Sequence, residues 1–154
     1  MEALAVVVGL DGSEGSLAAL AAAARLATLI GNRIVAVHVV SAQALPTTAP
    51  VTGAGALAVA GDEVMDRCHL DCELVLAGTD VSWQFEVRHG DPGTELAQAA
   101  IDHNAICVAI GRSLRRRFTC GSRSTVSERL LRRCDRPVLI VPTEPERAVP
   151  HGPS

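Results

Sequence analysis

Four short apolar runs, each rich in valine or isoleucine, constrain the fold of this chain more than any other feature of its sequence. Continuous apolar runs of this length are typical of strands buried on both faces, as in a parallel sheet. A fifth run, VSWQFEVR (81–88), alternates between apolar and polar residues and is expected nearer a sheet edge. Three of the four apolar runs are expected to form buried strands: LAVVVGL (4–10), RIVAVHVV (33–40) and AICVAI (105–110). The fourth, PVLIV (137–141), is expected to form a short strand at the sheet edge.

Helical segments alternate with these strands. Gly31 is expected to end the first helix, and Asp91 and Pro92 are typical of an N-cap followed by the first residue of a helix. The alternation predicts an α/β fold, a doubly wound parallel sheet with helices on both faces. The predicted helices are residues 16–31, 62–79, 92–104 and 125–134, and residues 41–61 are expected to form a long connection.

The composition excludes several function classes. A chain of 154 residues, 48% of them hydrophobic, fits one domain with a sizeable core. It has 14 arginines and no lysine, which excludes P-loop NTPases and Schiff-base enzymes. Aromatic residues make up 2% of the chain, so a flavin site and a single-stranded nucleic-acid site are both disfavoured.

Charge is distributed unevenly along the chain. Residues 1–100 carry 4 Arg and 12 Asp or Glu, whereas residues 101–154 carry 10 Arg and 5 Asp or Glu. The acidic part argues against nucleic-acid binding, and the basic part favours a local anion site or a solvated basic face. The loop from Arg112 to Arg123 holds five of these arginines and is therefore a candidate site for an anionic ligand or an acidic partner.

Five cysteines, an odd number, and the absence of a signal peptide favour a reducing cytoplasm. No apolar run predicts a membrane-spanning helix. Cys68, His69 and Cys72 resemble part of a metal site, but no second pair of ligands has matching spacing, so we expect no metal.

Several longer motifs occur together, and they read VVVGLDGSEGS, VRHGDPGTELAQAA, CVAIG and STVSERLLRRCDRPVLIVP. In this order and at this spacing, they make the chain resemble the universal stress proteins over nearly its whole length. The resemblance implies a five-stranded sheet of strand order 3-2-1-4-5 and a homodimer joined along the last strand, Val138–Val141. It also implies a universal stress protein domain over residues 1–142, followed by a polar tail, 143–154.

Members of this family that bind ATP carry Gly, two residues, Gly, nine residues, Gly, then Ser or Thr. Aligned on STVSE, the first glycine is Gly111 and the closing residue is Thr125, but Leu114 and Ser124 replace the other two glycines. A second register uses Gly121 and Ser122, but it places the first glycine at Val108, inside a strand. We adopt the first register, so the motif is degenerate, and weak ATP binding or its loss is expected.

The resemblance also assigns roles to residues. Asp11 is expected at the sugar of the nucleotide, and the backbone of Val39 at the adenine. Free N–H groups at the start of the helix after residue 124 favour an anion. Asp11 and Thr125 can also be explained without a ligand. Asp11 is then a turn and cap residue, and Thr125 forms a capping box with Glu128. The candidate nucleotide-binding residues are Asp11, Val39, Gly111, Arg112, Arg115, Ser124, Thr125, Val126 and Ser127.

Two functions remain open. The first is a stress protein that binds ATP or another adenine nucleotide, with slow hydrolysis or none, since no general base for fast chemistry is evident. The second is an interaction protein whose nucleotide motif has decayed and which acts through its dimer and its Arg-rich loop. The two missing glycines favour weakened or lost nucleotide binding, and no enzymatic activity is expected.

Overall fold

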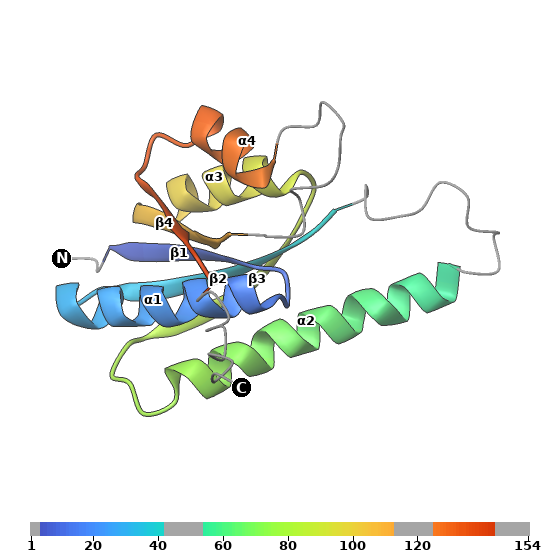
Figure 1. Cartoon of the computed structure of the whole chain (residues 1–154), viewed down its shortest axis with the longest axis horizontal. Helices are drawn as coiled ribbons and strands as arrows, with labels where there is room; N and C mark the ends of the chain where they lie inside the picture. Colours follow the sequence, from blue (N-terminus) through green and yellow to red (C-terminus); the bar gives the residue numbers. More distant parts are fainter. Residues whose placement is uncertain (1–3, 42–53, 113–124, 144–154) are drawn as a thin grey trace, which may run out of the picture.

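The computed structural model describes residues 4–41, 54–112 and 125–143 and shows strands and helices in strict alternation (Figure 1). The order of elements is the one expected from the apolar runs. The elements are β1 (Ala5–Leu10), α1 (Glu14–Ile30), β2 (Arg33–Val40), α2 (Ala54–Leu76), β3 (Trp83–His89), α3 (Pro92–Asp102), β4 (Ala105–Gly111), α4 (Val126–Arg133) and β5 (Val138–Val141).

The five strands form one parallel sheet of order β3-β2-β1-β4-β5, as predicted. Val6 and Val8 of β1 pack with the apolar residues of α1 and α2, whereas Val7 packs with those of α3 and α4. All three valines are fully buried, because β1 lies between two layers of helices. The continuous valine run of β1 therefore reflects burial on both faces.

The alternating fifth run forms β3 at one edge of the sheet, as its pattern indicated. The helix ends also follow the predicted signals. Gly31 caps α1 in the left-handed conformation (φ 67°), where glycine has no steric penalty. Asp91 is the N-cap of α3, and Pro92 begins that helix.

The predicted bounds of α2 were wrong at its start. The helix begins at Ala54, so eight residues assigned to the connection 41–61 are helical. The segment AGALAVAG contains glycines, but alanine is the strongest helix former and outweighs them over this length. The helix ends at Leu76, three residues before the predicted end at residue 79. Thr79 Oγ1 donates a hydrogen bond to the carbonyl of Leu76, the last residue of the helix.

Of the predicted tail, 143–154, all but the first residue lies outside the described part of the chain. The domain boundary at residue 142 therefore stays a prediction. Among the helices of the described residues, none combines the length and apolarity that a membrane span requires.

Candidate functional site

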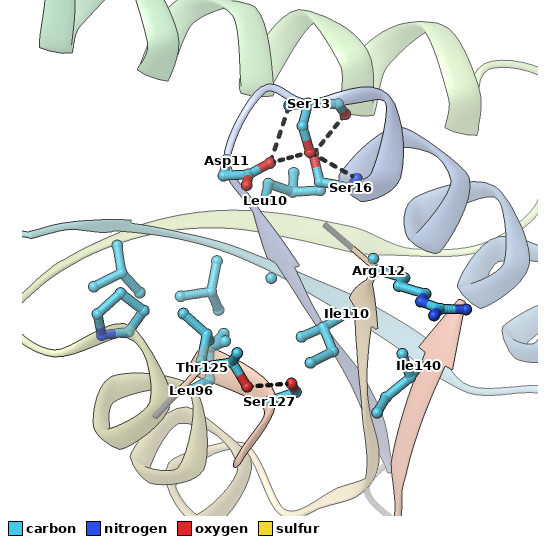
Figure 2. Close-up of a pocket in the computed structure, with 16 residues that line it drawn as sticks. Leu10, Asp11, Ser13, Ser16, Leu96, Ile110, Arg112, Thr125, Ser127 and Ile140 are labelled. Carbon is cyan, nitrogen blue, oxygen red and sulfur yellow. Dashed lines mark hydrogen bonds between the residues drawn. The ribbon is translucent and has the colours of Figure 1, made fainter. Parts of the chain in front are cut away.

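A cavity of about 460 Å³ lies at the carboxyl ends of the central strands, where β1 separates β2 from β4 (Figure 2). This is the point at which the strand order reverses, and ligands of doubly wound sheets bind at such points. The first turns of α1, α3 and α4 surround it. It is lined by Gly9, Leu10, Asp11, Ser13, Ser16, Val37, Val39, Pro92, Leu96, Ile110, Gly111, Arg112, Thr125, Val126, Ser127 and Ile140.

The floor of the cavity is a row of apolar residues that crosses the sheet. Val37 of β2 is the register partner of Gly9 in β1. A Cβ at Gly9 would lie 3.4 Å from Cγ2 of Ile110, so Gly9 and Ile110 are neighbours. Ile110 of β4 is in turn the register partner of Ile140 in β5. This floor row of Val37, Gly9, Ile110 and Ile140 gives the base of the cavity an apolar character.

The loop after β1 forms one polar wall. Asp11 is exposed, and its Oδ1 accepts hydrogen bonds from the backbone N–H (3.0 Å) and the hydroxyl of Ser13. Ser13 Oγ accepts the N–H of Ser16 (3.2 Å), so Ser13 is the N-cap of α1. Asp11 therefore belongs to the turn, as its ligand-free explanation proposed, but the capping residue itself is Ser13.

Beneath this loop lies a buried histidine and cysteine pair. His38 Nδ1 donates to the Leu10 carbonyl at 2.9 Å, and Cys68 Sγ lies 3.9 Å from the same nitrogen. Burial is the main cause that raises the pKa of Cys68 to about 11 and that of Cys72 to about 12. Both thiols are protonated at neutral pH and are poor nucleophiles. In the described part of the chain, no three His, Cys, Asp or Glu side chains are arranged to hold a metal ion.

Gly111 ends β4 where the first turn of α1 approaches the strand most closely. A Cβ at this position would overlap the backbone carbonyl of Gly15 and lie 2.7 Å from the nitrogen of Ser16. The next residue, Arg112, donates its N–H to the Val141 carbonyl at 2.8 Å, and its exposed side chain lines the cavity. Among the described lining residues, Arg112 carries the one positive charge and Asp11 the one negative charge.

The start of α4 forms the opposite polar wall, and a complete capping box satisfies backbone N–H groups at this helix end. Thr125 Oγ1 accepts the N–H of Glu128 at 3.2 Å, and Glu128 Oε2 accepts the N–H of Thr125 at 2.9 Å. The predicted capping box is thus confirmed. Thr125 Oγ1 also lies 2.9 Å from Ser127 Oγ, and both side chains face the cavity (Figure 2).

Seven of the nine predicted site residues line this one cavity: Asp11, Val39, Gly111, Arg112, Thr125, Val126 and Ser127. The other two, Arg115 and Ser124, lie outside the described residues, as does Leu114. That these residues bind a nucleotide stays a prediction. Nine lining residues were not among the predicted site residues: Gly9, Leu10, Ser13, Ser16, Val37, Pro92, Leu96, Ile110 and Ile140. The two serines belong to a strand-end loop that the sheet topology singles out, whereas no local signal indicates Ile140.

Comparison with known proteins identifies the family to which this chain belongs. The family model described as the universal stress protein family matches residues 4–142. The chain belongs to the universal stress protein family. A search of curated protein sequences found no match.

Solved structures of universal stress proteins have the same fold. A member from Burkholderia pseudomallei is 28% identical, with a TM-score of 0.63 over 90% of this chain and 96% of that one. UspA from Lactobacillus plantarum is 17% identical, with a TM-score of 0.68 over 92% and 99% of the two chains. A protein from Archaeoglobus fulgidus, solved in complex with dAMP, is 18% identical, with a TM-score of 0.58 over 92% and 99%.

Proposed function

We propose that this universal stress protein binds an adenine nucleotide in the cavity, with an affinity for ATP weakened by the loss of two motif glycines. The observation that carries the proposal is the convergence of residues from separate elements on one cavity with an apolar floor and polar walls. The floor row suits a purine ring. Asp11 is available to a ribose hydroxyl, and the starts of α1 and α4 favour a phosphate.

The solved relative with dAMP supports an adenine nucleotide as the ligand class. Weakness follows from the sequence, because glycine lets backbone N–H groups approach phosphate, and a side chain at such a position occupies that space. Leu114 and Ser124 stand where the binding members of the family have glycine. We therefore propose that the protein binds the nucleotide without hydrolysing it rapidly, and that it does so in the cytoplasm.

A second function, an interaction protein without a ligand, is favoured by two other observations. Gly111 is required by its packing against α1, and Thr125 and Glu128 satisfy each other, so neither needs a nucleotide to explain it. For such an interaction protein, the geometry of the cavity walls serves the fold alone.

Isothermal titration calorimetry with ATP and AMP separates the two functions. We expect ATP to bind more weakly than about 100 μM, which is about −5.5 kcal/mol. Leu114→Gly combined with Ser124→Gly is expected to strengthen ATP binding. Low-micromolar binding of ATP to the unmodified protein would show that the motif is not weakened, and no binding of either nucleotide would favour the interaction protein.

Thr125→Asp tests where the phosphate binds. Aspartate is as good an N-cap as threonine, so the stability of α4 should be kept, while its negative charge repels a phosphate at the helix start. The expected result is a loss of nucleotide binding with an unchanged melting temperature. Ser82→Asp is the matched control, because Ser82 is exposed at the amino end of β3, away from the cavity.

We also propose a two-fold homodimer joined antiparallel along Val138–Val141. In the described part of the sheet, β5 is an edge strand, and Leu139 and Ile140 are 39% and 42% exposed. Unpaired backbone groups on an apolar edge favour pairing with a second strand. Light scattering should give the mass of a dimer at micromolar concentration, and Ile140→Lys should give a monomer. A monomeric unmodified protein, or an unchanged variant, contradicts the proposal.

A further inference from the structure

The floor row of the cavity runs to the open edge of the sheet. Ile140, its last residue, lines the cavity and is 42% exposed, whereas Ile110 beside it is 7% exposed. In the part of the chain that the structure describes, no strand pairs with the outer side of β5. Among the described residues, the apolar floor therefore ends at an unpaired edge of the sheet.

Side-chain direction along β5 shows which residues face the cavity. Val138 packs with the α3 and α4 core, and Val141 packs with the α1 and α2 core. Since side chains alternate along a strand, Ile140 lies on the same face as Val138, and Leu139 on the same face as Val141. Leu139 is absent from the cavity lining, in agreement with this alternation.

Two-fold symmetry restricts which partner residue can lie opposite Ile140. An antiparallel edge-to-edge pair needs a two-fold axis perpendicular to the sheet, so side chains on one face meet side chains of the same face. Two registers pair more than one residue within Val138–Val141. With the axis at Ile140, Ile140 lies opposite the partner's Ile140, and with the axis at Leu139, it lies opposite the partner's Val138. In both registers a branched aliphatic residue stands about 4.5–5.5 Å away, measured between Cα atoms.

We propose that a second copy of this chain completes the cavity, because the partner's β5 adds the next side chain to the floor row. The inference rests on the proposed nucleotide cavity and dimer and goes beyond both. The occupant is a second copy because this edge is self-complementary: β5 has four apolar, uncharged residues, and a two-fold axis places two such edges against each other without opposing charges. Pro137 and Pro142 limit the pairing to these few residues. Each bound ligand then strengthens dimerisation by the factor by which dimerisation strengthens the binding of that ligand.

Leu139→Asp separates dimerisation from the cavity itself, since Leu139 is on β5 but faces away from the floor row. The variant should be monomeric and should bind AMP about tenfold more weakly, within the usual range of coupling between sites. Because the dimer has two cavities, saturating AMP should lower the dimer dissociation constant of the unmodified protein by about the square of this factor, about a hundredfold, in sedimentation equilibrium. Leu74→Asp is the control, because Leu74 is 67% exposed on α2, which covers the opposite edge of the sheet.

Dilution of the unmodified protein repeats the test without a variant. AMP affinity should fall as the protein concentration passes below the dimer dissociation constant. Equal AMP affinity for the monomer and the dimer overturns the inference while leaving the proposed function intact.

Disulfide cross-linking tests whether the partner's β5 lies beside Ile140, and it does so without a nucleotide. If no nucleotide binds but the cross-link forms, only the proposed function fails. Ile140→Cys should form a dimer cross-link if Ile140 lies on the axis. If Leu139 lies on the axis instead, the double variant Val138→Cys with Ile140→Cys should form a cross-link between position 138 of one protomer and position 140 of the other. Both cross-links are within the Cα–Cα distance that a disulfide spans. Mass spectrometry identifies the linked peptides. Failure of both variants to cross-link, with Leu74→Cys as the background, overturns the inference.

Discussion

At the scale of single residues, Gly111 shows how a motif residue can have a role in the fold. It is the first glycine of the nucleotide motif, yet its missing side chain also lets α1 begin against the end of β4. Gly15 makes the contact reciprocal, since a Cβ there would lie 3.1 Å from the Arg112 carbonyl. The close approach holds the loop after β1 and the end of β4 together as adjoining walls of the cavity.

Replacing Gly111 with alanine should therefore destabilise the protein even without a ligand. The added methyl group meets backbone atoms, which cannot rotate away, so we expect a loss of about 2–3 kcal/mol in the free energy of unfolding, the upper part of the range for overpacking. Urea denaturation measures it. Gly61→Ala is the control: it lies inside α2 with no atom within 4 Å of its Cβ position and should stabilise by about 0.5–1 kcal/mol. Equal effects of the two changes would contradict this role of Gly111.

At the scale of elements, α3 and α4 are joined near their starts. Asp91 Oδ2 accepts the N–H of Thr94 at 2.9 Å as the N-cap of α3, and Asp91 Oδ1 lies 3.2 Å from Nε of Arg129 in α4. Gly93 permits the close packing, since a Cβ there would lie 2.8 Å from Cβ of Arg129. The two helix starts thereby form one continuous wall of the cavity.

This junction should make stability depend on pH in the acidic range. Burial raises the pKa of Asp91, but hydrogen bonds from Thr94 and the charges of Arg129 and Arg133 lower it by more, so its pKa lies below the ordinary value. A carboxyl whose pKa is lowered in the folded state contributes stability above its unfolded pKa, about 3.9, and loses it as the pH falls through the folded value.

Asp91→Asn keeps the N-cap but does not titrate. The stability difference between the unmodified protein and this variant should therefore be largest near neutral pH and should shrink as the pH falls below about 4. Thermal denaturation between pH 7 and pH 3 measures both proteins. Two curves that stay parallel across this range would show that Asp91 does not contribute through its charge.

At the scale of the whole molecule, the uneven charge predicts a response to anions. Five arginines between Arg112 and Arg123 precede the start of α4, and most of them lie outside the described residues. Clustered like charges repel one another unless a counter-ion screens them. The start of one helix contributes only about 0.3–1 kcal/mol toward an anion, so arginine contacts would have to supply most of the affinity.

Phosphate should accordingly raise the melting temperature more than chloride does at equal ionic strength. Changing Arg115, Arg116 and Arg117 together to serine should abolish this difference. Changing Arg132 and Arg133 to serine, in the last turn of α4, should leave it in place. If phosphate and chloride act alike on the unmodified protein, the Arg-rich loop is only a connection between β4 and α4.

Much of the architecture was predictable from the sequence because its signals are local. The runs of valine in β1 and β2 report burial on both faces, and Asp91 with Pro92 reports a helix start through bonds that span three residues. The capping box of Thr125 and Glu128 is equally local. The start of α2 was missed because the composition of a loop-like segment concealed a strong run of helix-forming alanines.

The sequence by itself determined the order of the elements, most of their ends, and the strand-end loops in which Asp11 and Thr125 stand. Only the tertiary structure decided that Gly111 packs against Gly15, and that Ile140 extends the cavity floor to the edge of the sheet. The physical reason is range. A cap or a buried strand depends on residues a few positions apart, whereas these contacts join segments far apart in the chain that become neighbours once the sheet is assembled and α1 has packed on it.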